Sequence, residues 1–196
     1  MEEVVVLVQE LQSQNGQPFN IRTLITVFIS NIMCSINFGQ RFEHDNRRFV
    51  SLLKMINENL SNGNLPFIAS IFPFLRYIPG DSLKLRKVLH NVDMVSDYIY
   101  QIINDHDDSI DENNIRDFTN VYLKKLKSEE RNPQTTYDVE QVMKVVTDLF
   151  VAGTETTSAA LRWFTVFVIR NPEVQEKIRK EINDVIGDSR SSCLPG

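Results

Sequence analysis

The chain has 196 residues, of which 42% are hydrophobic and 24% are charged, and its formal net charge is −5. These values are ordinary for a globular protein, and the negative balance without Lys or Arg clusters argues against nucleic acid as a partner. No run reaches the ~18 uncharged apolar residues of a membrane span. The two cysteines, Cys34 and Cys193, do not make a disulfide framework, and we expect Cys34 to be a buried free thiol.

Three helices are predicted in the first third of the chain. The first covers residues 2–14 and ends at a turn formed by Asn15 and Gly16. The second covers residues 21–38, with Asn20 as its N-cap and Gly39 at its end, and its apolar spacing is typical of a core helix. The third covers residues 47–60. The sequence patterns of these three segments together predict a helical core.

Leu65 to Gly80 is strongly apolar, with Arg76 as its single charge. Its three prolines forbid one continuous helix. The segment is too short and too broken to span a bilayer, but it could dip into one membrane surface. A buried loop that covers the core explains it equally well, and the sequence leaves both interpretations open.

Four further helices are predicted downstream, over residues 81–106, 115–127, 139–170 and 173–187, with Pro172 at the first position of the last one. Asp138 is the expected N-cap of the third, with Thr135 and Thr136 as alternatives. An acidic stretch, residues 104–112, lacks the glycine and closing glutamate of a calcium loop, so we interpret it as a solvated link. His44, His90 and His106 show no metal-ligand spacing. We find no strands, and residues 188–196 are expected to be a disordered tail.

The helix over residues 139–170 has an unusual centre, because small and hydroxylated residues interrupt its bulky sequence. One of its faces carries Val145, Leu149, Ala152, Thr156 and Ala160. Gly153 would let a flat group approach the backbone closely, and the Thr156 hydroxyl can bond back to the carbonyl of Ala152. Glu155 sits next to Thr156, about 100° round the helix, and an acid beside an alcohol is a plausible proton-delivery pair. The alternative is that Gly, Ala and Thr mark only a close helix–helix contact.

The run Ala152-Gly-Thr-Glu-Thr-Thr157 resembles the central-helix signature of the haem-thiolate monooxygenases, the cytochromes P-450. Its continuation through Leu161-Arg-Trp163 and Asn171-Pro-Glu-Val174 is similar to the microsomal, drug-metabolising family-two branch. Upstream, Phe38-Gly-Gln-Arg-Phe42 and Phe74-Leu-Arg-Tyr-Ile-Pro-Gly80 resemble a helix end and a loop of the same family. The resemblance covers nearly the whole chain.

The resemblance implies an all-α chain, a partial cytochrome P-450 fold around one long central helix. Residues 1–196 would form a single incomplete domain, without the β-rich and haem-thiolate parts of the family and without its front segment. Cys193 does not match the family's iron-ligand loop, because Ser192 and Leu194 flank it where the family has glycines nearby. We therefore expect the axial cysteine of the haem to lie outside this chain.

The resemblance also assigns roles. Thr156 and Glu155 would be catalytic, with Thr156 donating a hydrogen bond in the oxygen pocket and Glu155 feeding protons. Ala152, Gly153 and Thr156 would contact the haem. The candidate substrate contacts would be Phe150, Val151, Asn59 and Leu60.

The implied parent activity is insertion of one oxygen atom from O2 into an apolar organic substrate of the xenobiotic, fatty-acid or steroid type. An NADPH-dependent reductase would supply electrons. The implied location is the cytosolic face of the endoplasmic reticulum membrane, contacted through Leu65 to Gly80. We expect this chain to be inactive alone because the cysteine-ligand loop is missing. The alternative is a non-catalytic helical module that binds a membrane or a partner.

Overall fold

The computed structural model describes residues 2–43, 46–63, 68, 71–72, 74–75, 85–107, 116–129, 132 and 134–187. Its helices are α1 (Glu2–Ser13), α2 (Ile21–Phe38), α3 (Arg47–Ser61), α5 (Leu85–Asp107), α6 (Phe118–Glu129), α7 (Val139–Arg170) and α8 (Pro172–Ile186). Within these described ranges there is no strand, so the predicted all-α class is confirmed.

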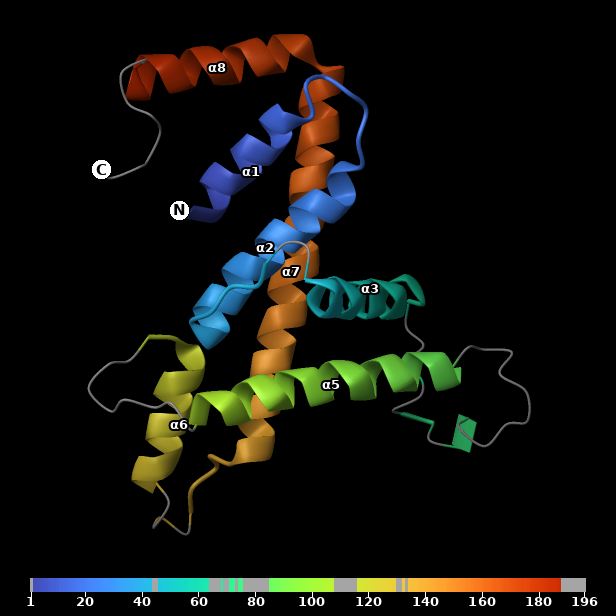
Figure 1. The fold of residues 1–196 in the computed structure, drawn as a ribbon, viewed down its shortest axis with the longest axis vertical. Helices are drawn as coiled ribbons and strands as arrows, with labels where there is room; N and C mark the ends of the chain where they lie inside the picture. The colour runs from blue at the N-terminus through green and yellow to red at the C-terminus, as the bar shows by residue number, and fades with distance from the viewer. Residues whose placement is uncertain are drawn as a thin grey trace.

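The longest helix, α7, forms the axis of the molecule (Figure 1). α2 packs along it and makes the most extensive contact between any two helices. α5 crosses the N-terminal half of α7, with α6 beside them, while α3 packs mainly on α5. α8 turns away from the end of α7, and α1 lies beside α2. The arrangement is that of a central helix with others laid across it, as the resemblance implied.

The core lies where α2, α3, α5 and α7 meet. α7 contributes Val142, Val146 and Phe150, each at most 1% exposed, and their spacing of four residues keeps them on one face. Phe38 of α2 packs against Phe150 with ring centroids 6.5 Å apart. Burial of such side chains is the main favourable contribution to folding.

Polar side chains define several helix ends. The Oδ1 atom of Asn20 accepts the N–H of Arg22 at 3.0 Å at the start of α2. Asp138 accepts the N–H of Gln141 at 2.6 Å at the start of α7, so Asp138 and not Thr135 or Thr136 is the cap. Both predicted caps are confirmed, and the bounds of α2 and α7 are those that the sequence predicts.

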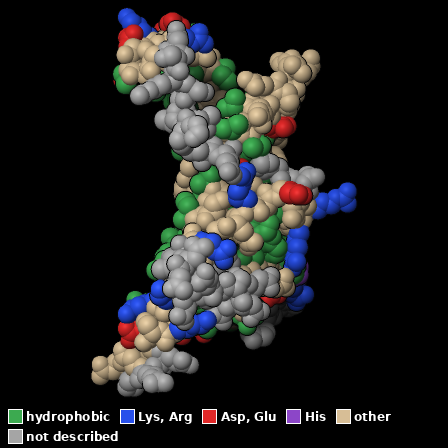
Figure 2. Space-filling model, turned by 60° about the vertical axis from the view of Figure 1, so that its left-hand side comes forward, with side chains coloured by type: hydrophobic (Ala, Val, Ile, Leu, Met, Phe, Trp, Pro, Cys, Tyr) green, Lys and Arg blue, Asp and Glu red, His purple; other side chains and the backbone are tan. Residues whose placement is uncertain are grey.

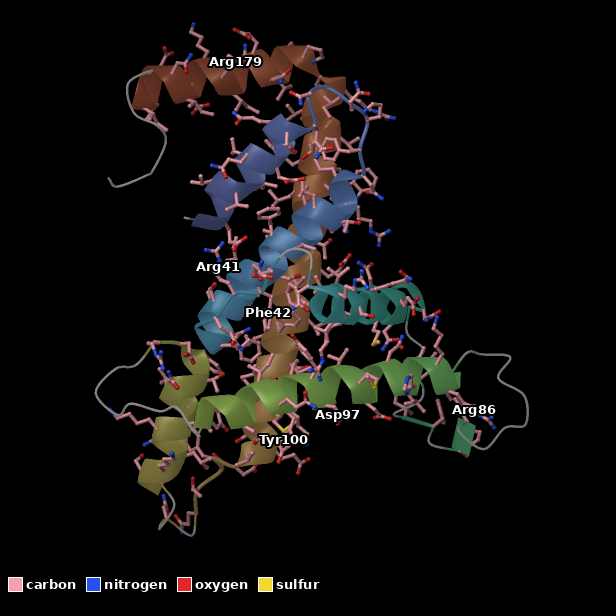
Figure 3. The ribbon with its side chains drawn as sticks, viewed as in Figure 1. Arg41, Phe42, Arg86, Asp97, Tyr100 and Arg179 are labelled. Carbon is pink, nitrogen blue, oxygen red and sulfur yellow. The ribbon has the colours of Figure 1, made fainter. Side chains whose placement is uncertain are left out.

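The segment after α2 is fixed by tertiary contacts. Gly39 has a φ of +61°, and a Cβ on it would lie 2.7 Å from a carboxylate oxygen of Asp117, so only glycine fits. The buried Asn31 side chain pairs with both backbone groups of Phe42, at 2.8 and 3.0 Å. Phe42 stacks on Phe49 of α3, with centroids 4.7 Å apart, and thereby ties α2 to α3 (Figure 3).

The start of α6 differs from prediction by three residues. We expected a helix over 115–127, and α6 begins at Phe118. The reason is Asp117, whose carboxylate accepts the N–H of Asn120 at 2.9 Å and acts as the N-cap. Much of Leu65 to Gly80, part of the acidic stretch 104–112, and the tail 188–196 lie outside the described residues.

α2 is the only helix in the described part of the chain whose length and apolar composition would suit a membrane crossing, and half of it is buried inside the protein. Its apolar residues pack on α7 and α3, which explains its composition as that of a core helix. Cys34 lies in it as a free thiol, 1% exposed. The predicted buried thiol is confirmed.

Candidate functional site

The candidate site is the middle of α7, where one face of the helix is left open. Leu149, Ala152, Thr156 and Ala160 are all exposed, and Val145 is half-buried. The Thr156 hydroxyl donates to the carbonyl oxygen of Ala152 at 2.7 Å, as the sequence predicted. Ala152 and Thr156 therefore form a small, accessible patch with one hydroxyl held on the helix backbone.

Gly153 does not belong to this open patch, because α2 approaches the helix there. A Cβ built on Gly153 would lie 2.5 Å from Cε and 2.6 Å from Sδ of Met33. Carbon atoms in contact normally stay about 3.5 to 4.0 Å apart. The glycine thus has a packing reason, which is the alternative that the sequence left open for this position.

The carboxylate of Glu155 is engaged by a cation. Arg162 contacts it at 3.0 Å, and the exposed fractions of the Arg162 and Glu155 side chains are 19% and 23%. The other guanidinium nitrogen of Arg162 donates to the hydroxyl of Thr26 in α2 at 3.3 Å. Glu155 and Thr156 are neighbours in sequence, but their side chains hydrogen-bond to different groups.

Of the two predicted substrate contacts on α7, Phe150 lies in the core and not on the open face. It is 1% exposed and packs against Phe38. The physical reason is its position four residues after Val146, on the buried face of the helix. Val151 is half-buried and packs against the edge of the same core.

The two predicted contacts on α3 have separate surroundings. The Asn59 amide donates to the backbone carbonyl of Val88 at 3.1 Å and accepts from Asn91 at 3.0 Å, so it ties α3 to α5. Leu60 is 45% exposed. The structure therefore brings together Ala152 and Thr156, while Phe150 and Asn59 serve the packing of the helices.

The open patch can form one wall for a flat group, but it holds no ligand for a metal. Among the described residues, no three His, Cys, Asp or Glu side chains are grouped to bind an ion. Burial raises the pKa of the Cys34 thiol far above its usual range, with Glu3 adding to the effect, so this sulfur stays a protonated thiol. Cys193 lies outside the described residues. Among the described residues, Ala152 and Thr156 leave room for one wall of a flat cofactor, and Cys34 is not available to bind a metal.

Comparison with known proteins agrees with this arrangement. The chain matches the Cytochrome P450 family model over residues 1–195. It is 37% identical to cytochrome P450 2C28 of Mesocricetus auratus and 38% identical to cytochrome P450 2C14 of Oryctolagus cuniculus, each over 196 residues. The chain belongs to the cytochrome P450 family. Cytochrome P450 2C6 of Rattus norvegicus is also 38% identical.

These matches cover 98% of this chain and 39% of each relative, so the chain spans about two fifths of the length of its curated relatives. Membership implies, at the level of the family, haem-dependent monooxygenase chemistry. All three relatives carry the 2C designation, in line with the family-two resemblance of the sequence.

Sequence reasoning missed the ion pair of Arg162 with Glu155 and the hydrogen bond from Arg162 to Thr26. A signal for the first was present, because Glu155 and Arg162 are opposite charges seven residues apart and so lie on one helix face. No signal was present for Thr26, which is 136 residues from Arg162 in the chain.

Proposed function

We propose that this chain forms the distal wall of a haem-dependent monooxygenase that inserts one oxygen atom from O2 into apolar organic substrates of the xenobiotic, fatty-acid or steroid type. Family membership supports the reaction class. The observation that carries the proposal is the open face of α7, where Ala152 and Thr156 are both exposed and the Thr156 hydroxyl lies 2.7 Å from the Ala152 carbonyl.

When bound, the haem would supply the activation of dioxygen. Ala152 would line its edge without steric hindrance, because its side chain is a single methyl group. The Thr156 hydroxyl, now donating to the Ala152 carbonyl, needs only a rotation about its Cα–Cβ bond to donate to a group in the open space. Gly153 supports this wall by letting α2 pack closely against the helix.

Glu155 would hold and pass a proton to the Thr156 side of the helix. In the structure its carboxylate is bound to Arg162. Proton delivery by Glu155 therefore requires its carboxylate to leave the Arg162 guanidinium and rotate towards Thr156. The strength of the ion pair with Arg162 would set the fraction of molecules in which Glu155 is released. Of the predicted substrate contacts, Leu60 is the one with a largely exposed side chain, and Val151 would border the pocket from α7.

The catalytic role of Thr156 is tested in a full-length, haem-loaded enzyme that carries this sequence. Thr156→Ala should lower the product formed per NADPH consumed and release the missing reducing equivalents as peroxide. Thr165→Ala is the matched control, because Thr165 makes the same bond to the carbonyl four residues earlier, at 2.8 Å. Coupling that stays equal in both variants would remove Thr156 from the mechanism.

The 196-residue chain by itself is proposed to be catalytically silent. The support is the donor set, since the buried Cys34 stays protonated and the neighbours of Cys193 do not match a thiolate loop. The test is to add haem to the purified chain, reduce it and add carbon monoxide. A Soret band of the thiolate type would overturn the proposal.

The proposed partners are an NADPH-dependent reductase and the cytosolic face of the endoplasmic reticulum membrane. The naming of the relatives as cytochromes P450 2C supports this location. Four described side chains between Leu65 and Gly80 support membrane contact because they are apolar and exposed: Ile68, Ile71, Phe72 and Phe74. Hydrophobic side chains also reach the surface elsewhere (Figure 2).

The same four side chains favour a second candidate function, a non-catalytic module that binds membranes. Co-sedimentation with phosphatidylcholine vesicles tests it, using Phe72→Ser with Phe74→Ser and, as control, the equally exposed Phe164→Ser and Phe167→Ser on α7. If only the first pair abolishes binding in a haem-free chain, this segment binds membranes without haem, and the carbon monoxide test above then decides between the module and the enzyme. Equal losses of vesicle binding in the two double variants would show non-specific hydrophobic adsorption and would refute this candidate function.

A further inference from the structure

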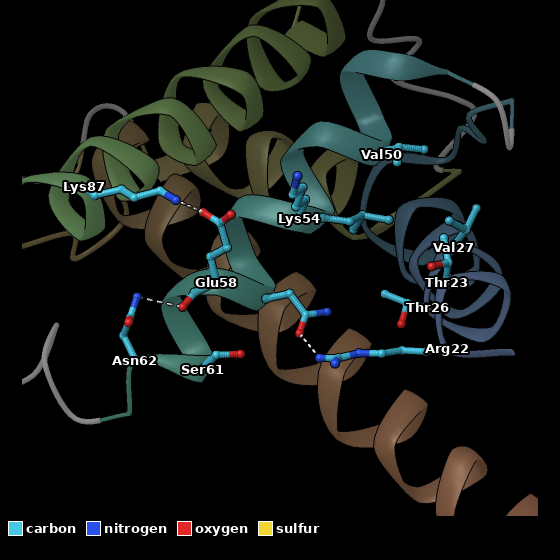
Figure 4. A pocket seen from close by; sticks show the side chains of 12 residues that line it. Arg22, Thr23, Thr26, Val27, Val50, Lys54, Glu58, Ser61, Asn62 and Lys87 are labelled. Carbon is cyan, nitrogen blue, oxygen red and sulfur yellow. Dashed lines mark hydrogen bonds and ion pairs between the residues drawn. The ribbon is translucent and has the colours of Figure 1, made fainter. Parts of the chain in front are cut away.

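A groove separate from the open face of α7 lies between α2 and α3 (Figure 4). Its volume is about 570 Å³, which is within the ~300 to 1,000 Å³ of small-molecule sites. Its apolar lining comes from Val27 and Leu53, which are 5% and 6% exposed, and from the half-buried Val50. These three side chains offer a contact surface for the apolar part of a ligand.

Three cations border the groove: Arg22 from α2, Lys54 from α3 and Lys87 from α5. One carboxylate also lines the groove, that of Glu58, which Lys87 contacts at 2.9 Å. This hydrogen bond to Lys87 is the main reason why the pKa of Glu58 is lowered, and the charge of Lys54 adds to it. Glu58 is therefore ionised, and the groove still has two more positive groups than negative ones.

Neither remaining cation, Arg22 or Lys54, forms an ion pair with Glu58, the carboxylate that lines the groove. Arg22 donates to the uncharged amide of Asn57 at 2.5 Å. Lys54 is exposed, and its charge helps to lower the pKa of Glu58. The ion pair of Glu58, however, is with Lys87. A local excess of positive charge stands out on a chain whose net charge is −5, and it favours an anionic ligand.

We propose that this groove binds an organic anion with an apolar body, a carboxylate or a sulfonate on a compact hydrocarbon. The anionic group lies between Lys54 and Arg22, and the hydrocarbon packs on Val27, Val50 and Leu53. The site is distinct from the proposed oxidation site, because the open face of α7 and the predicted contacts Asn59 and Leu60 do not line it. It does not depend on haem.

The test uses the 196-residue chain and two probes with the same ring system, 2-naphthoate and the neutral 2-naphthalenemethanol. Binding is followed by isothermal titration and by the NMR methyl signals of Val27, Val50 and Leu53. We expect 2-naphthoate to shift these signals and to bind more tightly than the alcohol. Raising the salt concentration should reduce the difference, because exposed charges are screened.

Lys54→Gln should weaken 2-naphthoate binding about two- to fivefold, since an exposed ion pair is worth up to ~1 kcal/mol and 1.4 kcal/mol is tenfold. Lys54→Arg should retain the affinity, and adding Arg22→Gln to Lys54→Gln should weaken it further. Lys144→Gln is the control, because it removes an exposed charge from α7, away from the groove. Circular dichroism confirms that each variant is folded.

Two results would overturn the proposal. One is binding of 2-naphthoate that is no tighter than binding of the alcohol. The other is an affinity that falls equally with Lys54→Gln and Lys144→Gln, which would show only the effect of net charge.

Discussion

The contact between Gly153 and Met33 gives a direct test of why glycine stands in the middle of α7. A Cβ at Gly153 would lie 2.5 Å from Cε and 2.6 Å from Sδ of Met33. Gly153→Ala therefore requires the end of the Met33 side chain to move by about 1 Å or more to restore normal contact distances. Met33 is flexible, so the helices need not separate.

Two opposing effects set the size of the change. Replacing glycine by alanine inside a helix gains about 0.8 to 1.0 kcal/mol from helix propensity. Overpacking a well-filled contact costs about 1 to 3 kcal/mol. Because only the flexible end of Met33 must move, the cost lies at the low end of that range, and we expect Gly153→Ala to change the stability of the chain by less than about 0.5 kcal/mol. In a Met33→Ala background the clash is absent, and the same substitution should stabilise by about 1 kcal/mol.

The assay is urea unfolding of the four members of this double-mutant cycle, which should show a coupling of about 1 kcal/mol. Ala160→Gly, at an exposed position of the same helix, measures the propensity scale and should cost about 1 kcal/mol. If Gly153→Ala stabilises the chain equally in both backgrounds, Met33 does not fill the space beside Gly153 and our account of this contact fails.

Three further predictions concern other positions. Phe150→Ala should destabilise by about 3 to 5 kcal/mol, because it empties a core site, whereas Phe164→Ala, 54% exposed, should change stability by less than ~0.5 kcal/mol; similar urea midpoints would contradict the burial of Phe150. Asp138→Ala should lower the free energy of unfolding by about 1 kcal/mol because it removes the N-cap of α7, and Thr136→Ala should lower it less. A larger loss of thermal stability for Thr136→Ala than for Asp138→Ala would show that Thr136 is the cap. Cys34, in a Cys193→Ser background, should resist iodoacetamide in the native chain and react in urea. The folded chain keeps this thiol protonated, while the unfolded chain releases its proton above pH ~8.5. Stability should thus fall as pH rises beyond that value, by up to ~1.4 kcal/mol per pH unit. Cys34→Ala should lessen this slope, and an unchanged slope would show that Cys34 does not cause it.

The helix bounds that sequence predicted best are those with a capping side chain and a clear apolar period. Asn20 and Asp138 stand directly before such periods, and both cap as expected. The start of α6 was placed too early because Asp117 was not recognised as a cap. Its role depends in part on Gly39, whose missing Cβ leaves room for the carboxylate, and this contact joins distant parts of the chain.

The candidate site shows the same division between local and distant information. The bond from Thr156 to Ala152 follows from a spacing of four residues and could be predicted. What fills the space beside Gly153 could not, because Met33 comes from another helix. Phe150 was assigned to the substrate from the resemblance, and its spacing from Val142 and Val146 places it on the buried face, so its substrate contact stays a prediction.

The centre of α7 serves packing and the proposed chemistry at once, on different faces. Thr154 and Ser158, 2% and 0% exposed, lie on the buried side, and Gly153 admits Met33 of α2 there. Their small size lets α2 lie close, which in turn brings Thr26 within reach of Arg162 and fixes the partner of Glu155. The packing alternative and the catalytic hypothesis are therefore not exclusive. A bulky residue at Gly153 would push α2 away, weaken the contact of Arg162 with Thr26, and so alter the setting of Glu155 without touching the open face.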